Sequence, residues 1–119
     1  KKAGLEPDVW WEVMKGGAAD SFVLHHDVPS IFAGHYDPSF RVELALKDLD
    51  LIQELIKENN TRAELTNAAH ERFKEAKERY GDKAGEMTVC KLIEEDGNVN
   101  LQVDGDWIAP WEVKHPNDK

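Results

Sequence analysis

The longest apolar pattern in the chain runs from about Val42 to Asn59 and has helical spacing. One apolar stripe lies along this segment, and a second stripe lies beside it. Residues of one stripe share a helix face, so both faces favour burial. A helix that is apolar over so much of its surface is expected to be central, with neighbours on two sides. The first stripe consists of Ala45, Leu49, Ile52 and Ile56, and the second of Leu44, Leu51 and Leu55.

Weaker patterns on both sides of this segment predict more helices. Pro7 and Asp8 suit a helix start, and Gly16-Gly17 ends the apolar run that follows them. Between residues 18 and 41, prolines and a glycine interrupt the pattern, which predicts short helical turns and loops.

After the central segment, two further helices are expected. Thr61 and Glu64 match a capping box, and Gly81 ends the helix that would follow. Asp82 is placed to cap a last helix that ends at Gly97 and turns Met87, Cys90 and Ile93 inward. Residues 1–97 are therefore predicted to form an all-α domain of four or five helices.

Residues 98–119 differ in character and are predicted to form a short tail. Val99, Leu101 and Val103 alternate with polar residues ahead of a turn signal at Asp104-Gly105, which favours a small hairpin. The two tryptophans of the tail, Trp107 and Trp111, fit an irregular packing arm equally well.

Charge and composition exclude several classes of function. The net charge is −9, with 24 acidic against 15 basic side chains, so nucleic-acid binding is not expected. No apolar run reaches the ~18 residues that a membrane helix needs, so no membrane partner is expected. Cys90 is the single cysteine, which favours a cytoplasmic location. The chain opens with Lys1-Lys2 rather than methionine, as expected for a fragment of a longer protein or for a chain that lost its methionine and kept residues of a tag.

One segment, residues 38–51, carries the candidate chemistry. Asp48 lies between Leu44 and Leu51 in the second apolar stripe, where an acid is costly to bury unless it is paired. Lys47 lies at the edge of the same stripe, and Phe40 lies just before the helix. We therefore expect Asp48 to be enclosed among leucines, with Lys47 at the mouth of a cleft.

This segment, an aromatic residue followed by Leu-x-x-Lys-Asp-Leu-x-Leu, resembles the C-terminal domain of the β-hydroxyacid dehydrogenases. That family includes 3-hydroxyisobutyrate dehydrogenase and, more distantly, 6-phosphogluconate dehydrogenase. The resemblance extends in order over roughly residues 3 to 95. Its other pieces are Gly4-Leu5-Glu6-Pro7, the Gly17–Phe22 stretch, Tyr36-Asp37-Pro38-Ser39-Phe40, and the later helices ending at Tyr80-Gly81-Asp82.

The resemblance implies an NAD- or NADP-dependent oxidoreductase acting on a small β-hydroxyacid or semialdehyde. Lys47 would contact the nicotinamide cofactor, Asp48 would hold neighbouring polar groups in place, and Phe40 would wall the substrate pocket. The family's helical domains also form homodimers or higher oligomers. The chain has no G-x-G-x-x-G motif and no upstream helix with Gly-x-x-x-Lys, whose lysine is the family's general acid. Residues 1–97 are therefore expected to be a truncated domain that is inactive alone.

Simpler interpretations stay open. Lys47 can pair with Glu43 and Asp50 on an ordinary solvated face, and Phe40 can be a core aromatic. The Lys/Glu-rich run from Glu71 to Arg79 is predicted to be solvated and internally paired. The chain can also be a stand-alone helical dimerisation or interaction module derived from the same scaffold.

No metal site is predicted from the sequence. His25 and His26 are adjacent, with His35 and Asp37 further along the chain. Adjacent side chains of a helix point about 100° apart and do not share a face.

Overall fold

The structure, a computed structural model, describes residues 1–108, and in this range it contains helices but no strand. The predicted all-α class is confirmed. Trp111, one of the two tryptophans of the predicted tail, lies outside the described residues. The chain divides into two compact units, one formed by residues 1–37 with residues from 93 onward, and the other by Pro38–Leu92. The helices in order are α1 (Pro7–Lys15), α2 (Phe22–His26), α3 (Val28–Ala33), α4 (Val42–Glu58), α5 (Glu64–Tyr80) and α6 (Thr88–Gly97).

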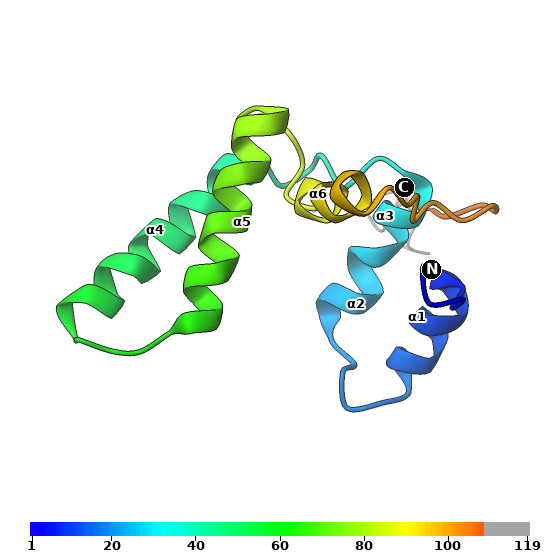
Figure 1. Cartoon of the computed structure of the whole chain (residues 1–119), viewed down its shortest axis with the longest axis horizontal. Helices are drawn as coiled ribbons and strands as arrows, with labels where there is room; N and C mark the ends of the chain where they lie inside the picture. The colour runs from blue at the N-terminus through cyan, green and yellow to red at the C-terminus, as the bar shows by residue number, and fades with distance from the viewer. Residues whose placement is uncertain (109–119) are drawn as a thin grey trace, which may run out of the picture. The chain divides into compact units, whose positions relative to one another are not determined.

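The Pro38–Leu92 unit is built on α4 and α5, which run side by side as a helical hairpin (Figure 1). Its core is centred on three fully buried side chains, Val42, Ala76 and Leu92. Burial of such apolar side chains is the main stabilising contribution available to the unit. Partly buried hydrophobic residues pack around this centre, namely Phe73, Tyr80, Ala84 and Val89.

Two predicted helix starts are wrong. Helix α5 begins after Ala63 with no side-chain cap, and the Thr61 hydroxyl points back to the Asn59 carbonyl instead. Helix α6 begins at Thr88 rather than after Asp82. Residues 82–86 instead pair with the chain that enters α4, since Val42 N–H donates to the Ala84 carbonyl and Glu86 N–H to the Phe40 carbonyl. These bonds satisfy backbone groups that a longer α6 would have used.

The second stripe of α4 is exposed. Leu44, Leu51 and Leu55 are all open to solvent within the described residues, as are Leu65 at the start of α5 and Ile93 in α6. The expectations that α4 has neighbours over both apolar stripes and that Ile93 turns inward are therefore wrong for the described residues.

The other unit is organised by three aromatic rings. Trp11 of α1, Phe32 of α3 and Trp107 of the tail meet edge to face, with centroid separations from 4.9 to 6.1 Å. Such T-shaped pairs are favourable beyond the area they bury. Trp107 thus holds the end of the described tail against helices from the start of the chain.

The described part of the tail is an irregular arm, not a hairpin. Residues 98–108 contain no strand, and Val103 N–H donates to the Phe32 carbonyl of α3. The buried Glu94 carboxylate accepts the Tyr36 hydroxyl and the Leu101 N–H. Among the described residues, no helix is long and apolar enough to cross a membrane.

Candidate functional site

Lys47 and Asp48 lie together on the outside of α4. The Lys47 ammonium is 3.4 Å from the Asp48 carboxylate, and the two side chains are 65% and 59% exposed. A pair so open to water contributes little to stability. The alternative pairing of Lys47 with Glu43 and Asp50 is not seen, because Glu43 pairs with Arg41 and Asp50 with His70.

The expected enclosure of Asp48 is wrong for the described chain. Leu44 and Leu51, the leucines on either side of it in the stripe, are themselves exposed. Asp48 therefore lies on an apolar face of α4 that is open to solvent, so its carboxylate does not need a buried partner. The sequence pattern located this face correctly, but it did not reveal whether another part of the chain covers it.

Phe40 lies immediately before α4 and is about one-third exposed. Its carbonyl accepts the Glu86 N–H, which holds the backbone at this point. Within the described residues, no hydrogen bond, ion pair or ring contact joins Phe40 to Lys47 or Asp48. The backbone thus places Phe40 just before one helix and Lys47 and Asp48 in the middle of it, with the last two side chains open to solvent.

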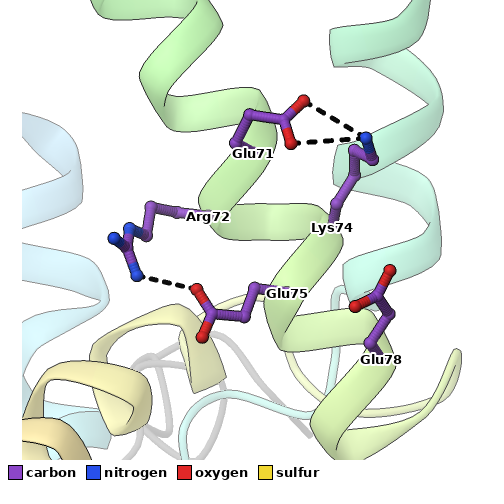
Figure 2. Close-up of a pocket in the computed structure, with 5 residues that line it drawn as sticks. All are labelled: Glu71, Arg72, Lys74, Glu75 and Glu78. Carbon is purple, nitrogen blue, oxygen red and sulfur yellow. Dashed lines mark hydrogen bonds and ion pairs between the residues drawn. The ribbon is translucent and has the colours of Figure 1, made fainter.

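Two pockets of the Pro38–Leu92 unit lie elsewhere. One of about 240 Å³ is lined by α5 alone, where Lys74 pairs with Glu71 and Arg72 with Glu75 (Figure 2). This charged face confirms the predicted solvated, paired run along α5, because the pairs follow helical spacing. A second pocket, of about 330 Å³, is lined by Leu46, Lys74, Lys77, Glu78 and Asp82. Neither pocket includes Phe40, Lys47 or Asp48.

The exposed face of α4 could provide one contact to a nicotinamide dinucleotide, through the Lys47 ammonium, but not a complete binding site for it. Lys47 has a flexible ammonium whose only ionic partner in the described chain is a weak, solvated one. Such a group can turn to a phosphate or carboxamide oxygen at small energetic cost. The chain offers no glycine-rich loop to hold the pyrophosphate.

One group of chemically capable residues was seen only in part from the sequence, which offered His26 and Asp37 but not Asp27. Side chains of His26, Asp27 and Asp37 converge where α2 meets α3. Asp27 follows His26 directly, whereas Asp37 is brought to them by the fold. No local spacing signals this group, because the turn between α3 and α4 sets the position of Asp37.

Comparison with known families gives one match over most of the chain. The family described as the NAD-binding domain of NADP-dependent 3-hydroxyisobutyrate dehydrogenase matches residues 1–93. The match ends within α6 and leaves the tail outside it.

Two curated relatives are both L-threonate dehydrogenases. The Haemophilus influenzae protein is 28% identical over 92 residues, which cover 77% of this chain and 31% of that protein. The Cupriavidus necator protein is 29% identical over 72 residues, covering 60% of this chain and 24% of that protein. The chain thus spans less than a third of either relative.

Proposed function

Because the chain belongs to the family of NAD-binding domains of NADP-dependent 3-hydroxyisobutyrate dehydrogenases, we propose that it is the C-terminal cleft domain of an NAD(P)-dependent oxidoreductase. NAD or NADP is the cofactor of this family. The proposed substrate is a small β-hydroxyacid or its semialdehyde. The names of the relatives support this class, since L-threonate is also a small hydroxylated carboxylate. We place the enzyme in the cytoplasm.

The observation that carries the proposal is the exposed Lys47–Asp48 pair on an uncovered apolar helix face. When bound, the nicotinamide supplies or accepts the hydride. Lys47 would contact the cofactor, and Asp48, 3.4 Å away, would keep the ammonium oriented. Phe40 would form part of the substrate wall and exclude water, which strengthens charge interactions there.

The role of Lys47 is tested in the protein expressed from its complete gene. Lys47→Ala should raise the KM for the cofactor by about tenfold or more, the loss of one ionic contact. Lys57→Ala is the matched control, because Lys57 is an exposed lysine in the last turn of the same helix. An unchanged cofactor KM in Lys47→Ala would remove Lys47 from the site.

The 119-residue chain alone is proposed to be inactive. Residues equivalent to the glycine-rich loop and the general-acid lysine are not in its sequence. Titrating NADH into the purified chain while following tryptophan fluorescence should give no saturable quenching at micromolar cofactor. Saturable tight binding would contradict this part of the proposal.

A second function, a stand-alone helical dimerisation or interaction module, is favoured by the same uncovered leucines of α4. The reading frame distinguishes the two. A strand, glycine-rich loop and helix encoded directly upstream would support the enzyme, whereas a start codon at Lys1 would support the module. In both cases, the leucine face is proposed to join subunits into a homodimer or higher oligomer.

A further inference from the structure

We propose that His26, Asp27 and Asp37 bind one divalent transition-metal ion, with Zn²⁺ as the best-fitting ion. One ligand atom from each of these side chains lies within 4.8 Å of the other two. A four-coordinate zinc ion holds nitrogen and oxygen ligands about 2 Å from its centre, so small side-chain rotations bring this group to bonding distance. A water molecule would complete the four positions.

Burial of the two carboxylates is the first argument for a cation. The Asp27 side chain is 8% exposed and Asp37 is 2% exposed, although both are acids. Two carboxylates held this close out of water repel each other, and a cation between them removes the repulsion. A divalent ion between the two carboxylates would lower this repulsion while the imidazole stays neutral.

The surroundings of Asp27 are the second argument. Among the described residues, its carboxylate receives a hydrogen bond only from His26 Nδ1, at 2.7 Å, from within the same group. An ionised carboxylate has about four acceptor positions, so most of those on Asp27 remain available. A metal ion would take the place of the proton that this nitrogen and oxygen now share.

The position of the imidazole is also constrained. The Phe22 ring stacks on the His26 ring with centroids 4.8 Å apart and planes 20° apart. The stacked ring restricts the tilt of the imidazole plane, and the hydrogen bond between Nδ1 and Asp27 Oδ1 holds that nitrogen on the side of the Asp27 carboxylate. Imidazole with carboxylate ligands suits Zn²⁺ and Co²⁺, whereas Ca²⁺ needs at least about six oxygen ligands.

A neighbouring pair provides an internal comparison. His25 Nε2 lies 2.5 Å from Asp20 Oδ1, but these side chains are 51% and 46% exposed. This pair has the same two residue types in the same helix region but belongs to no such group of three ligands in the described chain. It is therefore the matched control for His26.

The test is calorimetric titration of Zn²⁺ into the purified, tag-free chain at neutral pH. We expect one tightly bound ion per chain, no comparable binding of Ca²⁺, and binding weakened by at least about tenfold in His26→Gln. His25→Gln should retain the wild-type affinity. Absence of stoichiometric binding, or equal affinity in both variants, would overturn the proposal.

A measurement on the unmodified chain covers the case in which His26→Gln fails to fold. Paramagnetic Co²⁺ added to the ¹⁵N-labelled chain should shift or broaden the amide signals of Asp27 and Asp37 first. The amide signal of Asp20 should change less than those of Asp27 and Asp37 at one equivalent. Effects that are first seen around Asp20 and His25 would place the ion elsewhere and overturn the site.

Discussion

The hydroxyl of Tyr36 donates a hydrogen bond to the buried carboxylate of Glu94, which lies 58 residues further along the chain. The other oxygen of that carboxylate accepts the Leu101 N–H at 2.6 Å. A single side chain of α6 therefore links the turn after α3 to the start of the tail. Both bonds lie within the unit formed by residues 1–37 with residues from 93 onward.

Tyr36→Phe should lower the free energy of unfolding by about 1–3 kcal/mol, because it leaves a buried carboxylate oxygen without its donor. Urea denaturation followed by circular dichroism measures the change. A double-mutant cycle with Glu94→Gln should give a clear coupling energy, since the two groups are in contact. Glu54→Gln, at an exposed position of α4, is the control and should be neutral. Additive effects of Tyr36→Phe and Glu94→Gln would contradict the link.

Gly81→Ala should destabilise the protein by about 1–3 kcal/mol, even though an added methyl group would meet no atom within 4 Å. The reason is the backbone, because Gly81 ends α5 with φ 87° and ψ 164°, a region almost restricted to glycine. Gly16→Ala is the matched control at the end of α1, where φ is −96° and an added methyl group would make only an ordinary contact, 3.9 Å from the Val13 carbonyl oxygen. Equal midpoints of urea denaturation for the two variants would show that the conformation of Gly81 is not required.

Lys47→Ala and Asp48→Asn should each change the free energy of unfolding by less than about 0.5 kcal/mol, as expected for a solvated pair. Leu92→Ala should cost about 2–5 kcal/mol, because this side chain is fully buried in the core of its unit. Comparing these free energies of unfolding with that of Leu92→Ala shows whether Lys47 and Asp48 stabilise the fold. A large loss of stability in Lys47→Ala would assign the lysine to the fold rather than to a cofactor.

Replacing Leu51 and Leu55 together with glutamate should shift the chain to a monomer at tens of micromolar, as measured by light scattering. The two leucines are exposed side by side on α4, and charges there would oppose the burial of that face between subunits. Arg72→Glu, on the exposed charged face of α5, should leave the oligomeric state unchanged. A strictly monomeric wild-type chain would contradict the proposed interface itself.

Where the sequence predicted correctly, local patterns were sufficient. The start of α1 at Pro7 and the extent of α4 follow from proline geometry and apolar spacing, which act within a few residues. The start of α6 was misplaced, because backbone bonds between residues 82–86 and 40–43 compete with a longer helix there. The start of α5 was misplaced for a different reason, because the Thr61 hydroxyl contacts the Asn59 carbonyl instead of capping the helix.

The sequence by itself determined the helical class, the α4 pattern around Lys47 and Asp48, and the resemblance to the dehydrogenase family. These properties depend on periodicity and motif order, which are read along the chain. Tertiary structure alone decided that one leucine stripe of α4 is exposed, that Glu94 holds Tyr36 and Leu101, and that Asp37 joins His26 and Asp27. Such contacts depend on how the chain turns between helices, and residues distant in sequence meet only after those turns have formed.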